Sequence, residues 1–194
     1  MTALVLGLIL FLGVHSVRIV ADDWRTRTIA DVGEARWKGV YSLVSLVGFV
    51  LIVWGYGLAR QSPVILWIAP GWGRHAASSL MLISFVLLGA YGLRGSRLAT
   101  AVRHPMLWAV IAFALAHLLA NDTLADLLLF GGFGAWALLD LQAAYRRDRH
   151  AGRKPVPGGW PATAAAVGVG IGLWVAFAYW LHIWLIGVSP IARG

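Results

Sequence analysis

The sequence predicts an all-α membrane protein, a polytopic helical bundle with about six transmembrane helices. Hydrophobic residues make up 60% of the 194 residues, and charged residues make up only 12%. This composition lacks the polar surface of a soluble domain. The hydrophobic residues are also gathered into six runs, each near the length that a helix needs to cross a bilayer core of about 30 Å. These runs cover residues 2–21, 39–59, 76–93, 105–120, 124–145 and 162–187.

The boundaries of the runs follow ordinary sequence signals. No lysine or arginine precedes the first run, so we expect a retained span rather than a cleaved signal peptide. Pro105 opens the fourth run, and proline is well tolerated in the first turn of a helix. The segment 153–161 contains three prolines and two glycines and is expected to be a loop between the last two runs. Because no long polar region remains, residues 1–194 are expected to form a single domain.

The basic residues indicate the orientation of the chain. Among the 16 lysines and arginines, five lie at or after the end of the first span, three follow the third and five follow the fifth, and the others are Arg60, Arg74 and Arg193. Cytoplasmic connections of membrane proteins carry an excess of positive charge. We therefore expect both termini on the outer, periplasmic side of the membrane. The net charge of +8 follows from this topology, and the expected surroundings are a lipid bilayer, with no nucleic acid as a partner.

Two histidines inside the hydrophobic runs are the best lead to function. His15 lies in the first run and His117 in the fourth. An ionisable group at this depth is costly and commonly functional, and imidazole is the commonest metal-binding side chain. The chain has no cysteine, which excludes disulfides and thiolate ligands. Two histidines from separate helices can bind a haem iron from opposite faces, and without a Cys-x-x-Cys-His string this would be a non-covalent haem b.

Two charged residues are expected near His15. Arg18 lies three residues further along the same helix and projects from the same side, where it can meet a carboxylate or a haem propionate. Asp140 lies at a similar depth, about one turn from the cytoplasmic end of the fifth run. We expect it to form either a salt bridge at this depth or a hydrogen bond to His15. The alternative for His15 is a buried histidine that is bonded to a neighbouring helix.

A second polar group accompanies the fourth run. His104 immediately precedes this run, so Arg103 and His104 are expected to form a polar cluster at the cytoplasmic interface; Arg103 can equally be an ordinary cytoplasmic charge. His117 follows near the outer end. At about 1.5 Å per residue, His15 lies about 9 Å from the cytoplasmic edge and His117 about 20 Å from it. This difference in depth leaves His182 as a rival partner for His117, and His104 as a rival partner for His15.

At these residues the chain resembles a known family of bacterial integral membrane proteins, the NnrU family, which is related to the 15-cis-zeta-carotene isomerases of plants and cyanobacteria. The resemblance covers most of the chain in the order of spans and the placement of loops. It implies a multi-pass protein of the bacterial inner membrane. The matching strings are His15-Ser16, Arg103-His104-Pro105 and Ala116-His117.

The resemblance also implies a haem b site. The carotene isomerases hold a haem b that takes part in redox-dependent double-bond isomerisation, and the histidines that match His15 and His117 are its proposed ligands. These isomerases carry a competing cysteine ligand at the position of Ala114, so ligand exchange of that kind is not expected here. NnrU proteins are associated with denitrification, through nitrite or nitric oxide reduction. A haem that binds a small apolar or gaseous ligand such as nitric oxide would connect these properties, with denitrification or redox proteins as partners.

Two other functions remain open. The string Arg103-His104-Pro105 also occurs in isoprenylcysteine-type membrane methyltransferases, where it helps to bind S-adenosylmethionine. Those enzymes use acidic residues downstream of the string, whereas the only glutamate of this chain, Glu34, lies upstream. The other function is that of a non-enzymatic assembly or partner protein, which would use its basic loops to meet another protein or anionic lipid. Such a protein would not need buried histidines.

Overall fold

The computed structural model describes residues 1–93 and 95–191, and Arg94 and Arg193 of the charge comparison lie outside these residues. The described residues form an all-α fold without a β-sheet, as the sequence predicts, and only two isolated β-bridges occur among them. The long helices are α1 (Thr2–Val20), α3 (Glu34–Ala59), α4 (Gly73–Gly92), α6 (Pro105–Ala120), α8 (Gly132–His150) and α9 (Trp160–Ala176). The shorter ones are α2 (Asp22–Val32), α5 (Arg97–Val102), α7 (Leu124–Asp126) and α10 (His182–Ile186).

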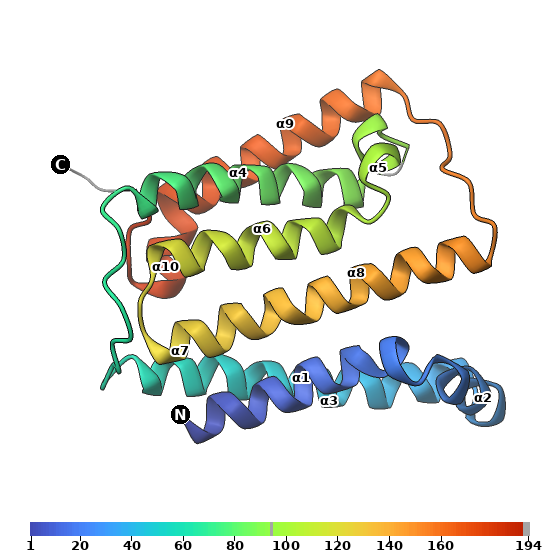
Figure 1. Ribbon diagram of the computed structural model, residues 1–194, viewed down its shortest axis with the longest axis horizontal. Helices are drawn as coiled ribbons and strands as arrows, with labels where there is room; N and C mark the ends of the chain where they lie inside the picture. Colours follow the sequence, from blue (N-terminus) through green and yellow to red (C-terminus); the bar gives the residue numbers. More distant parts are fainter. Residues whose placement is uncertain (94, 192–194) are drawn as a thin grey trace.

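Five helical segments in the described part of the chain are long and apolar enough to cross a membrane. Two of them are composite, because a π-helical turn joins α7 to α8 at Leu127–Gly131 and another joins α9 to α10 at Phe177–Leu181. The expected fourth span, α6, has the predicted limits but only 16 residues. At 1.5 Å per residue it is about 24 Å long, which is short of a bilayer core of about 30 Å. Helix α6 packs between α4 and α8 (Figure 1).

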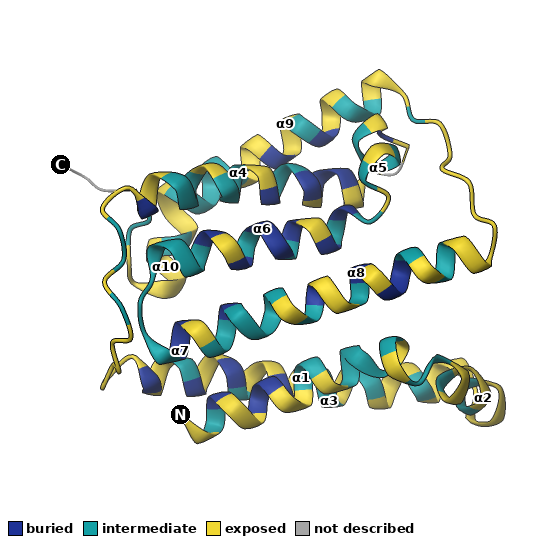
Figure 2. Cartoon of the chain, viewed as in Figure 1, coloured by how far each residue is buried: buried dark blue, intermediate teal, exposed yellow. Residues whose placement is uncertain are grey.

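The outer surface of the bundle is apolar. Large aliphatic side chains are exposed along the helices, and Ile9, Val53 and Leu139 are each more than half exposed. Figure 2 shows such exposed positions along the outer faces of the long helices. A soluble protein does not expose apolar side chains continuously over its surface. The chain is therefore a multi-pass membrane protein whose exposed apolar faces contact lipid.

The helices pack in the spatial order α3, α1, α8, α6, α4 and α9 (Figure 1). The contact between α1 and α3 is especially close, since small residues at helix interfaces allow two backbones to approach. A Cβ atom added at Gly48 of α3 would lie only 2.8 Å from the backbone nitrogen of Phe11. Gly7 of α1 and Gly55 of α3 meet the partner backbone just as closely. This pairing fixes the part of α1 that leads to His15.

Two short helices in the basic connections were not predicted from the sequence. Helix α2 begins with Asp22 and Asp23, and acidic residues stabilise the first turn of a helix. Helix α5 is capped by Ser96, whose Oγ accepts a hydrogen bond of 3.0 Å from the backbone nitrogen of Ala99. Helix α2 lies at the end of the bundle beside the end of α1 and the start of α3 (Figure 1). It thereby contributes side chains to the cavity around His15.

Candidate functional site

A cavity of about 530 Å³ lies near the α2 end of the bundle, and His15 lines it. We call it the His15 cavity. Its walls come from α1, α2, α3, α6 and α8, and its volume lies within the range of about 300–1,000 Å³ that is typical of small-molecule and cofactor sites. The side chains that matter most for its chemistry are those of Arg18, Arg25, Lys38, Tyr41, Met106 and Trp136.

The imidazole ring of His15 is held in a defined orientation. Its Nδ1 donates a hydrogen bond of 2.6 Å to the backbone oxygen of Phe11, one turn earlier in α1. The ring stacks on the ring of Phe11 at a centroid distance of 4.3 Å, and the rings of Tyr41 and Trp136 lie 5.1 and 6.0 Å away. In the neutral ring with its proton on Nδ1, Nε2 has a free lone pair. This lone pair can bind a metal ion or accept a hydrogen bond.

Three cationic side chains surround the same cavity. Arg18 and Arg25 share Asp22, at nitrogen-to-oxygen distances of 4.0 and 3.8 Å, and Lys38 lies 2.7 Å from Glu34. Exposed pairs of this kind contribute little free energy. An anionic ligand can therefore compete for these cations, so the cavity combines a histidine with positive charge.

Trp136 adds an unused hydrogen-bond donor. Its indole Nε1 is buried and donates to no residue in the described part of the chain. A buried donor without a partner costs about 1–3 kcal/mol, and such groups are rare in folded proteins. Trp136 also lines the His15 cavity. The wall of the cavity thus contains one buried indole N–H group that lacks a hydrogen-bond acceptor.

Asp140 lines the His15 cavity and forms a salt bridge, which is one of the two arrangements expected from the sequence. Its Oδ1 accepts a hydrogen bond of 3.1 Å from Nη2 of Arg147. The same arginine donates through Nη1 to the backbone oxygen of Arg18, at 3.2 Å. The salt bridge at this depth therefore uses Arg147, two turns further along α8, and the Nδ1 proton of His15 goes to Phe11 instead of Asp140.

The structure does not bring His117 to the His15 cavity. Nδ1 of His117 donates to the backbone oxygen of Phe113 at 2.9 Å, and its ring stacks on Phe130 at a centroid distance of 4.4 Å. Met106, on the same helix, does line the cavity. At 1.5 Å per residue, His117 lies about 16 Å further along α6 than Met106. The difference in depth estimated from the sequence is thus present in the folded chain.

The two rival histidines also lie outside the His15 cavity. Nε2 of His104 is 3.1 Å from Oδ2 of Asp148 without the geometry of a hydrogen bond, and the ring meets the edge of Tyr145 at 5.0 Å. His104 is therefore packed against α8. Nδ1 of His182 donates to the backbone oxygen of Val188 at 2.6 Å. Neither histidine shares a cavity with His15.

Arg103 is exposed and connects α5 to α6. Its φ of 60° and ψ of −48° lie outside the regions that side chains other than glycine usually adopt. It does not line the His15 cavity. Together with the packing of His104 on α8, this arrangement separates the Arg103-His104 cluster from the cavity.

Several residues of the cavity escaped the sequence analysis. The sequence analysis used Arg25 and Lys38 only to orient the chain in the membrane. No sequence motif contains Tyr41, Met106 or Trp136. Aromatic residues close to an intramembrane histidine were the available signal. Among the described residues, no group of three His, Cys, Asp or Glu side chains lies close enough to hold a metal ion. In the His15 cavity, a metal would thus depend on further ligands from a bound cofactor.

The family resemblance was based on three short strings, at His15-Ser16, Arg103-His104-Pro105 and Ala116-His117, whereas a family model compares nearly the whole chain. Residues 3–190 match the family model described as NnrU protein. No curated protein and no solved structure matches the chain. The match spans nearly the whole chain, including both the helices around His15 and those around His117, and it confirms the resemblance found in the sequence. This multi-pass membrane protein belongs to the NnrU family.

Proposed function

We propose that this protein binds haem b in the His15 cavity, with Nε2 of His15 as the iron ligand. The observation that carries the proposal is the orientation of His15. Its Nδ1 donates a hydrogen bond to a backbone carbonyl, and its ring lines a cavity of the size of a cofactor site. Histidines that bind metals commonly donate their second ring nitrogen in this way. His117, which the sequence pairs with His15, occupies another part of the bundle.

The other residues of the cavity suit the two parts of a haem. Tyr41 and Trp136 offer aromatic surface to a flat macrocycle. Arg18, Arg25 and Lys38 offer positive charge to its two propionates, and arginine is especially suited to carboxylates because its guanidinium can donate two parallel hydrogen bonds. The indole nitrogen of Trp136 is buried in the wall of this cavity without an acceptor.

The proposed role is the binding of nitric oxide or a related small molecule in nitrite and nitric oxide metabolism at the bacterial inner membrane. A haem with one histidine ligand supplies an open iron position at which such a molecule can bind. The apolar and aromatic part of the wall, which includes Val14, Met106 and Trp136, would limit access of water to that position. Isomerisation is less well supported, because Ala114 replaces the competing cysteine and is buried outside the His15 cavity.

A visible spectrum of the purified protein tests this proposal. The wild type, His15→Ala and His117→Ala are each expressed with ample haem and purified in detergent as folded protein, as judged by gel filtration. We expect a Soret band in the wild type and in His117→Ala, and its loss in His15→Ala. The band of the wild type should also shift when nitric oxide is added to the reduced protein.

His117→Ala is a matched control, since His117 makes the same bond to a backbone carbonyl one turn earlier. A colourless wild type would contradict the proposal and favour a partner protein without a cofactor. A band lost only in His117→Ala would contradict the assignment to the His15 cavity. Loss in both variants would instead support the pair of axial histidines that the sequence suggests.

A further inference from the structure

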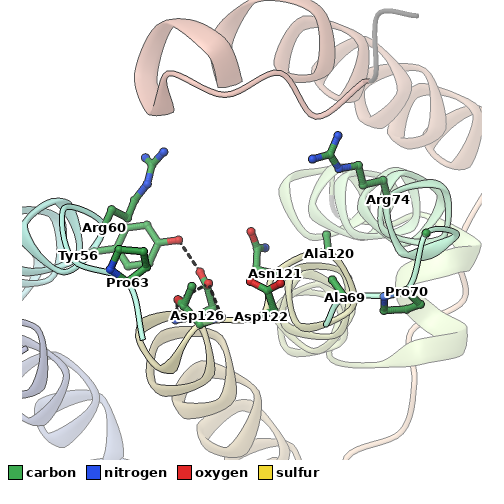
Figure 3. A pocket seen from close by; sticks show the side chains of 12 residues that line it. Tyr56, Arg60, Pro63, Ala69, Pro70, Arg74, Ala120, Asn121, Asp122 and Asp126 are labelled. Atoms are coloured by element: carbon green, nitrogen blue, oxygen red, sulfur yellow. Dashed lines mark hydrogen bonds between the residues drawn. The ribbon is translucent and has the colours of Figure 1, made fainter. Parts of the chain in front are cut away.

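A second cavity, of about 440 Å³, lies at the end of the bundle opposite α2. It is formed where α3 ends, where α4 begins and where α6 passes into α7 (Figure 3). We call it the Arg60 cavity. Its rim is tied together by two backbone hydrogen bonds of 2.8 Å, from Leu66 to Asp122 and from Leu124 to Val64. The connection between α3 and α4 is thereby fixed against the turn between α6 and α7.

Two arginines line this cavity on opposite sides. Arg60 follows the last residue of α3, and Arg74 lies in the first turn of α4 (Figure 3). Nη1 of Arg60 donates to the backbone oxygen of Ile186 at 2.9 Å. Among the described residues, no carboxylate oxygen lies within 4.0 Å of either guanidinium group. Both side chains therefore retain donors for a ligand.

The buried acid of this cavity does not neutralise the arginines. Asp126 is only 4% exposed. Its Oδ1 accepts from the hydroxyl group of Tyr56 at 2.6 Å, and its Oδ2 accepts from the backbone and the hydroxyl group of Thr123 at 3.2 and 2.5 Å. These three donors occupy the carboxylate of Asp126. Asp122 also lines the cavity, but neither carboxylate lies within 4.0 Å of a guanidinium nitrogen of Arg60 or Arg74.

The distribution of charge along the chain points in the same direction. The sequence puts only Arg60, Arg74 and Arg193 on the side of the membrane away from the basic connections. Arg193 lies outside the described residues, and the other two line one cavity. In membrane proteins, lysine and arginine are usually concentrated in the cytoplasmic connections, so these two arginines lie on the side where positive charge is less common. Its concentration at one cavity indicates a role in binding an anion.

The surroundings place this anion site at the membrane surface. Ile65, Ile68 and Trp72, in the connection that forms the rim, are 66%, 91% and 60% exposed. Exposed apolar side chains and tryptophan next to polar groups are typical of the interface between lipid and water. The phosphate groups of lipids lie at this level, and arginine binds phosphate through charged, directed hydrogen bonds.

We propose that the Arg60 cavity binds a phosphate group through Arg60 and Arg74, in a site separate from the His15 cavity. The group comes either from an anionic phospholipid headgroup or from a soluble phosphate. The carboxylate network of Asp126 holds the opposite wall, and the two guanidinium groups donate to the phosphate oxygens.

Two binding measurements on the same purified protein test this site and distinguish the sources. In delipidated protein in detergent, thermal unfolding is followed with sodium phosphate or with sodium chloride at equal ionic strength. In native mass spectrometry, retention of phosphatidylglycerol is compared with that of phosphatidylcholine. Stabilisation by phosphate supports a soluble ligand, and selective retention of phosphatidylglycerol supports a lipid headgroup. We expect Arg74→Gln and the double variant Arg60→Gln, Arg74→Gln to weaken the observed binding more than about tenfold, because each loses a charged hydrogen-bond donor.

Arg27→Gln provides the matched control, because Arg27 is exposed on α2 and lines neither cavity. It should bind phosphate or phosphatidylglycerol like the wild type. Arg74→Gln separates binding from folding, because the side chain of Arg74 makes no hydrogen bond to another described residue, whereas the side chain of Arg60 bonds to the backbone of α10. The proposal is overturned if neither probe binds selectively, or if both cavity variants bind as well as Arg27→Gln does. These outcomes do not depend on whether haem is bound.

Discussion

Replacing Gly55 with alanine is expected to destabilise the protein by about 1–3 kcal/mol, although alanine is the better helix former. A Cβ atom at this position would meet the backbone of α1 at Leu4, and would lie 2.7 Å from the carbonyl carbon of Ala3. Backbone atoms cannot turn aside as a flexible side chain can, so α1 and α3 must separate. The measurement is the free energy of unfolding in detergent.

Gly57→Ala is the matched control on the same helix, because no atom lies within 4 Å of the added methyl group. Here the helix propensity of alanine acts alone, and stability should rise by up to about 1 kcal/mol. The two substitutions are thus expected to have opposite signs. Equal effects would contradict the close packing of α1 on α3. Because this packing also holds His15 against Tyr41, Gly55→Ala should weaken haem binding as well.

Replacing Asp126 with alanine is expected to lower the free energy of unfolding by about 2–4 kcal/mol. Thr123 remains as the N-cap residue, but the variant removes the half of the capping box in which the Asp126 carboxylate accepts from Thr123. Buried donors left without an acceptor cost about 1–3 kcal/mol. In this variant the hydroxyl group of Tyr56 and both donors of Thr123 lose their acceptor. Unfolding in detergent measures the effect.

Asp122→Ala is the control for this prediction, since Asp122 lies in the same turn but outside the carboxylate network. Asp122→Ala should lower the free energy of unfolding much less than Asp126→Ala does. A double-mutant cycle with Tyr56→Phe isolates the bond between α3 and α7, because removing both partners leaves no unpaired hydroxyl group. Additive effects of Tyr56→Phe and Asp126→Ala would show that the two side chains are not coupled.

The limits of the hydrophobic helices could be predicted because their signals are local. The first run matches α1 within one residue, and the fourth matches α6, which starts at Pro105. Helix α2 was missed because its composition is polar and its sequence lies in a connection that was used only for its charges. The count of six membrane-crossing helices is not confirmed, because α6 is apolar but has only 16 residues and is shorter than the five other segments.

The candidate site was only partly accessible to sequence reasoning. His15, Arg18 and Asp140 were predicted to lie at a similar depth, and all three line the His15 cavity. The partner of Asp140 is Arg147, however, because a long arginine side chain reaches back along α8. The contacts of His104 with Asp148 and Tyr145 likewise depend on how α6 packs on α8. Such choices between distant residues follow from tertiary packing, which no short string encodes.

A cryo-electron microscopy structure of the haem-loaded protein would show directly where the haem binds. We expect porphyrin density in the His15 cavity, with iron next to Nε2 of His15 and the propionates toward Arg18, Arg25 or Lys38. Porphyrin density next to His117 and Phe130, with the His15 cavity empty, would contradict this placement.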